Sequence, residues 1–176
     1  MIEKKHAFLF AIVLIAVGMI VRFIPHAANM TPMTAVALFA GVYLPKRYAI
    51  AIPLAAMVLS DIFIGFHNLI LVTWGSFVVM TLLGMWLRKR KQAWTIAGSA
   101  LAGSVFFFLV TNWAVMQFDV MYPHSLAGLM QSYVAGIPFF RNMLIGDLVY
   151  TALLFGVYEA VLHKEKILSF RRQTVV

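Results

Sequence analysis

Long apolar runs separated by short polar or basic connections make up most of this 176-residue chain. A helix needs about 20 apolar residues to cross a bilayer, and fewer where other helices surround it. The runs predict six membrane-spanning helices, over residues 7–24, 32–44, 48–66, 69–87, 94–118 and 137–162. The second is short for a full span. We treat residues 1–176 as one domain.

Prolines and polar residues set the expected helix ends. Thr31 and Pro32 predict the start of the second helix, with Thr31 as its N-cap. Pro53 predicts a kink in the third helix. Ser125 is an expected N-cap for a separate short helix over 126–135, lying near the membrane interface. The first apolar run lacks a clear small-residue cleavage site, so we interpret it as a retained helix rather than a signal peptide.

Composition excludes an ordinary water-soluble domain. Hydrophobic residues make up 63% of the chain, charged residues only 11%, and the mean hydropathy is +0.93. Soluble domains are about half apolar and about a quarter charged. Twenty charged residues (14 Lys and Arg, 6 Asp and Glu) cannot coat a protein of this size. We therefore predict an all-α integral membrane protein, whose main surroundings are the lipid bilayer.

The net charge of +8 does not indicate a nucleic-acid partner, because the basic residues form short clusters between apolar runs. Lys and Arg mark the cytoplasmic side of membrane proteins. With both termini inside, six crossings place twelve of the fourteen basic residues on that side. They are Lys4, Lys5, Lys46, Arg47, Arg88, Lys89, Arg90, Lys91, Lys164, Lys166, Arg171 and Arg172. Arg22 and Arg141 are expected near the outer ends of helices.

Signatures of soluble catalysis are absent from the sequence. It has no GxxxxGK[ST], GxGxxG or HExxH motif, and it has no cysteine, which excludes disulfides and thiolate metal sites. Ionisable residues inside a membrane span are costly and usually functional. Asp61 and Asp147 fall in the outer half of their helices, whereas Glu159 can reach the inner interface. We expect no catalytic residues, resident cofactor or metal.

The outer connections collect histidine, asparagine, arginine and aromatic residues, whereas the inner ones carry basic residues. This asymmetry predicts a substrate pocket that opens outward, with aromatic walls and a few oriented polar groups. Its candidate residues are Arg22, His26, Asn29, Asp61, His67, Trp74, Asn112, Trp113, Tyr122, His124, Phe140, Arg141, Asn142 and Asp147. The arginines would bind anionic groups, the aspartates would bind donors or hold the arginines, and the rings would stack on a flat ligand.

Other interpretations stay open for the same residues. Trp74, Trp113 and Tyr122 also suit an aromatic belt at the membrane interface. Arg22 and Asp61 also suit a structural ion pair between helices. Two carboxylates at similar depth, Asp61 and Asp147, would suit an intramembrane acid–base enzyme. A ligand-free structural protein is the third class. Three outer histidines suit a metal, although no spacing signature supports one.

Several segments resemble a family of small six-helix bacterial membrane proteins. They are RFIPHAANMTP (22–32), PLAAMVLSDIFIGFH (53–67), FFFLVTNWAV (106–115) and YPHSLAGLMQSYVAGIPFFRNMLIGDLVY (122–150). That family is related to the S components, which are the substrate-binding subunits of energy-coupling-factor (ECF) vitamin transporters. The resemblance covers most of the chain and implies six helices in the bacterial cytoplasmic (inner) membrane, with both termini cytoplasmic.

The resemblance also implies a function. S components bind a vitamin or similar micronutrient from outside, and a module of one membrane coupling subunit and two ATPase subunits drives its release inward. Small residues four apart on the first helix often contact the coupling subunit, and Ala7 and Ala11 match that spacing. Solitary cobalamin-uptake proteins are the nearest understood relatives. A well-known cobalamin binder among them ligates cobalt through cysteine, so here a corrinoid substrate would need His26, His67 or His124, or no axial ligand.

Overall fold

The computed structural model describes the backbone of residues 4–173 and the side chains of residues 6–164. The basic side chains predicted at both ends, Lys4, Lys5, Lys166, Arg171 and Arg172, lie outside the described side chains. Over residues 4–173 the chain is helical, with no strand. The helices are α1 (Lys4–Val21), α2 (Met33–Tyr43), α3 (Lys46–Ala49), α4 (Ala51–Ile64), α5 (Ile70–Leu87), α6 (Ala93–Phe118) and α7 (Leu126–Gln173).

Four helical segments are long and apolar enough to cross a membrane, namely residues 46–64, 70–87, 93–118 and 126–164. Two shorter apolar helices, residues 6–21 and 33–43, accompany them. Large apolar side chains cover the outside of the bundle instead of polar ones, and Phe63 and Leu71 are among the most exposed. A bundle that is apolar both inside and outside indicates a multi-pass membrane protein. The prediction of an all-helical membrane protein is confirmed at this level.

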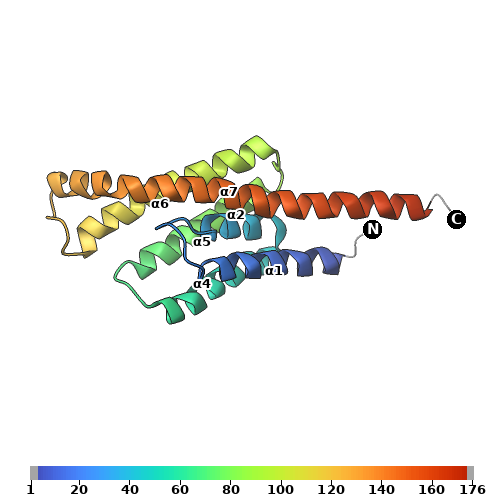
Figure 1. The fold of residues 1–176 in the computed structure, drawn as a ribbon, viewed down its shortest axis with the longest axis horizontal. Helices are drawn as coiled ribbons and strands as arrows, with labels where there is room; N and C mark the ends of the chain where they lie inside the picture. The colour runs from blue at the N-terminus through green and yellow to red at the C-terminus, as the bar shows by residue number, and fades with distance from the viewer. Residues whose placement is uncertain (1–3, 174–176) are drawn as a thin grey trace.

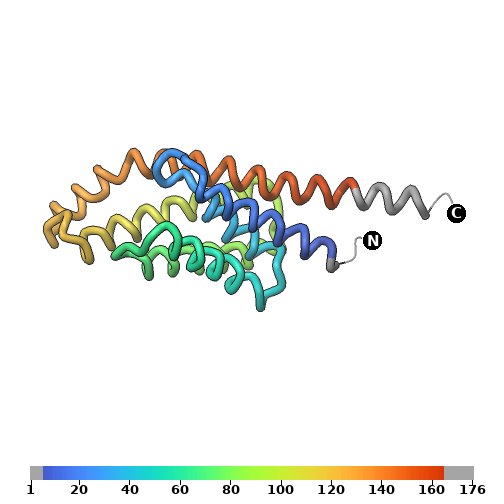
Figure 2. Tube along the Cα trace, turned by 60° about the horizontal axis from the view of Figure 1, so that its bottom comes forward, coloured from blue at the N-terminus to red at the C-terminus, as the bar shows by residue number. Residues whose placement is uncertain are grey.

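The short helix α2 occupies the centre of the bundle (Figure 2). Every residue from Met33 to Val42 is buried, and the helix packs mainly against α5 and α7. Gly41 of α2 faces Gly84 of α5, and a Cβ on either glycine would collide with the backbone of the other helix. Small residues permit this close approach. Because α2 has no lipid-facing side, it does not need the length of a full span. It begins at Met33 with Pro32 in the N-cap position, so the predicted Thr31 cap was wrong.

The last helix differs from the prediction. Residues 126–135 and 137–162 were expected as two helices, but both belong to the 48-residue helix α7, with Pro138 inside it. Proline removes one backbone hydrogen bond and bends a helix without always ending it. Figure 2 shows the first turns of α7 inclined to the rest. Ser125 does cap this helix, because its Oγ accepts a hydrogen bond from the Gly128 N–H at 3.2 Å.

The predicted kink at Pro53 is confirmed as a break between α3 and α4. Proline has no N–H to donate to the carbonyl of Ala49, and the break lies at Ile50. Helix α4 ends at Ile64, and Gly65 caps it with a φ of 109°, in the left-handed region. The Gly65 N–H donates to the Asp61 carbonyl at 2.8 Å. Helix α1 ends at Val21, three residues earlier than predicted, and a series of turns follows it.

Both termini lie at one end of the bundle (Figure 1), together with the basic connections over 44–50 and 88–92. At this end Arg88 caps α2: its Nε donates to the Gly41 carbonyl at 2.7 Å and its Nη2 to the Leu44 carbonyl at 2.6 Å. The connections over 22–32, 65–69 and 119–125 lie toward the opposite end. The basic and the polar–aromatic connections are thus separated in space, as in the sequence pattern.

Of the two small residues on α1 that match the expected spacing, Ala11 lies inside the bundle and Ala7 is half-buried. Ala11 is 0% exposed and belongs to the main apolar core, and the Ala7 carbonyl accepts a hydrogen bond from the Tyr158 hydroxyl at 3.2 Å. Small side chains here let α1 pack against α2 and α7. Ala11 is thus buried within this chain, and the expected contact of Ala7 and Ala11 with a partner subunit stays a prediction. Large residues such as Leu9 and Val13 form the exposed side of α1.

Candidate functional site

A cavity of about 470 Å³ opens among the ends of the helices far from the termini. Residues of α2, α4, α5, α6 and α7 line it, together with residues from all three connections at that end. Small-molecule sites are typically cavities of about 300–1,000 Å³ with mostly apolar walls and a few polar groups. Five phenylalanines and one tyrosine supply the aromatic wall here: Phe77, Phe107, Phe108, Tyr122, Phe139 and Phe140. Its size and lining suit a small organic molecule.

The structure brings half of the predicted site residues to this cavity. Those that line it are Arg22, Asn29, His67, Asn112, Tyr122, Phe140 and Asp147. Those that do not line it are His26, Asp61, Trp74, Trp113, His124, Arg141 and Asn142. Of the second group, three are exposed on the outside of the bundle and do not contribute to the cavity wall: Trp113, His124 and Arg141.

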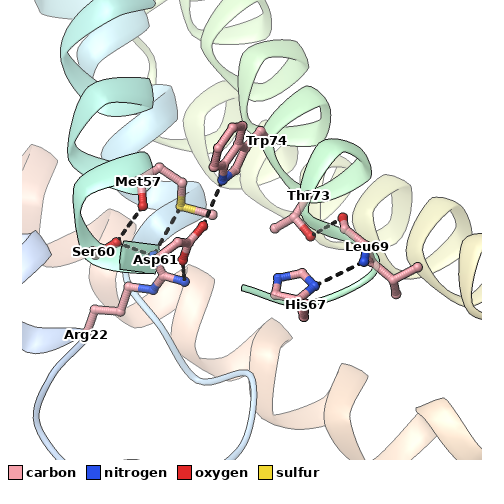
Figure 3. A network of polar contacts seen from close by, with 8 residues as sticks. All are labelled: Arg22, Met57, Ser60, Asp61, His67, Leu69, Thr73 and Trp74. Atoms are coloured by element: carbon pink, nitrogen blue, oxygen red, sulfur yellow. Dashed lines mark hydrogen bonds and ion pairs between the residues drawn. The ribbon is translucent and has the colours of Figure 1, made fainter. Parts of the chain in front are cut away.

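Asp61 lies behind the cavity wall at the centre of a polar network between α1, α4 and α5 (Figure 3). Its Oδ1 pairs with Arg22 Nη2 at 2.5 Å, and its Oδ2 accepts a hydrogen bond from Trp74 Nε1 at 2.7 Å. Arg22 Nη1 also donates to Ser60 Oγ, which in turn donates to the Met57 carbonyl at 2.8 Å. Asp61 is 1% exposed and Arg22 13%. The structural ion pair, one of the open interpretations, is confirmed.

This network changes what Arg22 can offer to a ligand. Its guanidinium reaches the cavity, but its charge is balanced by Asp61. Asp61 and Asp147 do not share an open site, because Asp147 lines the cavity and Asp61 does not. Trp74 is oriented by its hydrogen bond to Asp61, which the aromatic-belt interpretation alone would not explain. The network joins three helices and fixes one wall of the cavity.

Asp147 is the carboxylate that faces the cavity. It lies on α7, is 1% exposed, and accepts a hydrogen bond from Ser104 Oγ of α6 at 2.7 Å. Thr34, in the first turn of α2, is its second hydroxyl neighbour. Partial positive charge at a helix N-terminus favours a nearby anion. Among the described side chains, no Lys, Arg or His nitrogen lies within 4.0 Å of Asp147, in contrast to Asp61.

Asn112 braces α6 against α7 beside the cavity. Its side-chain Nδ2 donates to the Phe108 carbonyl at 2.8 Å. Its main-chain carbonyl accepts a hydrogen bond from Ser132 Oγ at 2.9 Å. Gly136 makes room for it, because a Cβ there would lie 2.5 Å from Asn112 Oδ1. Gly136 and Ser132 also line the cavity. The polar groups of Asn112 therefore hold the wall together as well as facing the space.

The connection between α1 and α2 covers one side of the cavity. Asn142 Nδ2 on α7 donates to the Ala28 carbonyl at 3.2 Å, and Asn29 adopts a left-handed conformation with a φ of 62°. Asparagine tolerates this conformation better than most residues. The Nδ1 atom of His26 lies 2.6 Å from the main-chain carbonyl oxygen of Ile24, within the same connection. Asn142 and His26 thus shape this connection, whereas Asn29 lines the cavity.

A second connection, between α4 and α5, brings His67 to the rim. The Leu69 N–H donates to His67 Nδ1 at 3.2 Å, and Thr73 Oγ1 donates to the Leu69 carbonyl at 2.9 Å (Figure 3). His67 is exposed at this position and lines the opening. Its Nδ1 is therefore used as an acceptor within the turn, which leaves Nε2 to face outward.

A family model described as "Family of unknown function (DUF6580)" matches residues 2–170. The chain belongs to this family. No curated protein and no solved structure matches it. The matched range spans all seven helices except the last residues of α7, so the DUF6580 family shares the segments that build the cavity.

Hydroxyl side chains line the cavity of this DUF6580 protein, although none was among the candidate site residues predicted from the sequence. Thr31, Thr34, Thr73, Thr111 and Ser132 line the cavity, and Ser104 bonds to Asp147. Ser104 lies in a run of small residues on α6, which the sequence explains as close helix packing. From the sequence alone, a serine such as Ser104 suits either close helix packing or a hydrogen bond to a buried acid. Its position beside Asp147 of α7 shows that it makes the hydrogen bond.

The histidines give the DUF6580 protein no metal centre among the residues whose side chains are described. His26, His67 and His124 are exposed on three different connections. In that part of the chain, no three His, Cys, Asp or Glu residues gather closely enough to hold an ion. The cavity lining offers aromatic faces, hydroxyl and amide groups, and one buried carboxylate.

Proposed function

We propose that this chain is a membrane-embedded substrate-binding protein that captures a vitamin or similar micronutrient. The observation that carries the proposal is the cavity of about 470 Å³, enclosed by aromatic rings and oriented polar groups at one end of an apolar bundle. A protein that only anchors or braces a membrane has no need for such a space. Buried ionisable groups such as Asp147 add to the argument, because they are costly within a membrane.

The resemblance to S components of ECF transporters supports the same function. It suggests that the protein delivers its substrate with a membrane coupling subunit and two ATPase subunits, or alone. The chain carries no ATPase motif of its own. If a coupling subunit docks on α1, the structure leaves it the exposed side around Leu9 and Val13 rather than Ala11.

The charge distribution supports an outward-facing cavity. The basic connections with Lys46, Arg47 and residues 88–91 lie at the end of the bundle with the termini, and the cavity lies toward the other end (Figure 1). By the positive-inside rule, this separation supports cytoplasmic termini and a cavity on the outer side. The bacterial inner membrane is proposed from the resemblance to S components. Fusion of a reporter that is active only in the cytoplasm, at residue 176 and in the 119–125 connection, tests this orientation.

Mass spectrometry of co-purified small molecules tests the function. The protein is extracted from its own membranes in mild detergent, washed, denatured and analysed for released compounds. We expect one compound in near-stoichiometric amount from the wild type and less from Gly136→Val, which fills the cavity beside Asn112. Gly98→Val is the matched control, because a Cβ at Gly98 meets no atom within 4 Å.

Repeated isolation of folded protein without any bound compound, and without binding from a panel of vitamins, would contradict the proposal. Equal amounts of compound from Gly136→Val and Gly98→Val would place the ligand outside this cavity. If the bound compound is instead chemically converted during incubation, the protein is an intramembrane enzyme. The structure favours that alternative less, since Asp61 is engaged by Arg22 and Trp74 away from the cavity lining.

A further inference from the structure

The ionisable side chains that line the cavity bear on the charge of the substrate that it can bind. Four side chains that can carry a charge near neutral pH line it: Arg22, His67, Asp119 and Asp147. Arg22 is neutralised by Asp61, and His67 is exposed at the rim. Two carboxylates remain without a basic partner within 4.0 Å among the described side chains. The cavity therefore offers its contents two carboxylates that have no basic partner of their own.

Asp147 is the deeper and more constrained of the two carboxylates. It is 1% exposed, while Asp119 is half-buried and accepts a hydrogen bond from the Val120 N–H at 2.7 Å. Burying a carboxylate is costly unless it is paired and hydrogen-bonded. Ser104 and the first turn of α2 stabilise it in part, because a helix N-terminus carries about half a unit of positive charge. Among the described side chains, no basic group completes the neutralisation.

Aromatic rings line the same cavity as this carboxylate. Phe108 and Phe140 lie with ring centres 4.6 Å apart, and Phe77 and Phe107 with ring centres 5.5 Å apart. All four line the same cavity as Asp147. Aromatic faces attract cations, and the attraction grows when water is excluded. A cavity that holds both a buried acid and aromatic faces is a suitable environment for a positively charged nitrogen.

We propose that the substrate is an organic cation, whose ammonium or charged ring nitrogen pairs with Asp147 while its apolar part lies against the phenylalanines. This inference rests on the proposed function and names the substrate class of the same cavity. It replaces the expectation from sequence that Arg22 and Arg141 bind an anionic group. Arg22 is already paired, and Arg141 is exposed outside the cavity lining.

The test compares three probes of one shape and different charge. They are 1-naphthylmethylamine, 1-naphthylmethanol and 1-naphthoic acid, each titrated at neutral pH against purified protein in lipid nanodiscs and followed by calorimetry. Close charge pairs in binding sites are worth enough to change Kd by about tenfold or more. We expect the amine to bind at least about tenfold more tightly than the alcohol. The acid should bind weakest.

The variant Asp147→Asn keeps an acceptor for Ser104 and removes the charge. It should lose the preference for the amine and retain binding of the alcohol, whereas Asp119→Asn should keep most of the preference. Equal binding of amine and alcohol by the wild type, or preference for the acid, would overturn the cation proposal and leave the cavity a binding site. This comparison uses the wild-type protein alone, so it does not depend on whether a variant folds. Binding of none of the probes, with an anionic or neutral compound co-purified, would also overturn it. Absence of any compound would instead contradict the proposed function.

Discussion

Replacing Asp61 with asparagine removes one charge from the network that joins α1, α4 and α5. The amide oxygen of the new side chain can still accept the hydrogen bond from Trp74, so the change isolates the loss of the partner of Arg22. Leaving one member of a buried ion pair without its partner costs about 3–5 kcal/mol. Arg22 retains 13% exposure and can gain some water, which places the expected loss of unfolding free energy at the lower end, about 3 kcal/mol.

The reverse change, Arg22→Met, should cost more, about 4–5 kcal/mol, because Asp61 is 1% exposed and would keep its charge. The double variant removes both charges, so its loss should be well below the sum of the two. Unfolding by SDS in mixed micelles, followed by helix circular dichroism, measures all three. Asp119→Asn is the matched control at a more exposed acid, and we expect a change within about 0.5 kcal/mol. Additive losses in the double variant would refute the coupling.

Three further outcomes can be measured, the first two in the same unfolding assay and the third together with a probe titration. Gly84→Ala should destabilise the protein by about 1–3 kcal/mol, because its Cβ would collide with the backbone of α2, while Gly98→Ala should not destabilise it. Arg88→Ala should lower the free energy of unfolding by about 2 kcal/mol, because two hydrogen bonds that cap α2 are lost. Arg90 stacks on the exposed ring of Trp86, so Arg90→Ala should lower it by less than about 1 kcal/mol. Gly136→Ala should weaken ligand binding more than it lowers stability, measured by probe titration against unfolding; the opposite order would contradict its place at the cavity.

The sequence predicted most of the helices because their limits depend on local signals. The expected helix over 94–118 differs from α6 by one residue, and that over 69–87 differs from α5 likewise. Pro53 and Ser125 acted as expected because a missing N–H and a free hydroxyl have effects on their own turn. The predicted division between residues 135 and 137 was wrong. Whether a proline such as Pro138 bends or ends a helix depends on what packs around it.

The site was predicted in part, for a reason that the aspartates illustrate. Their cost within a membrane made both conspicuous, but the sequence could not tell which one faces the cavity. That difference depends on partners from other helices, Arg22 for Asp61 and Ser104 for Asp147. Ala11 shows the same limit, because small residues suit contacts inside the chain and contacts between chains equally well.

The central position of α2 has a consequence for the order of assembly during synthesis. At 11 residues this helix is about 16 Å long, roughly half of the hydrocarbon thickness, so it cannot span lipid by itself. One of its contacts, from the Tyr43 hydroxyl to Glu159, joins residues 116 positions apart. At about 5–20 residues per second the ribosome needs roughly 6–23 s to make that stretch. Until α7 is synthesised, α2 lies in an incomplete bundle. A chain truncated before α7 would leave its most buried helix without one of the two partners that enclose it.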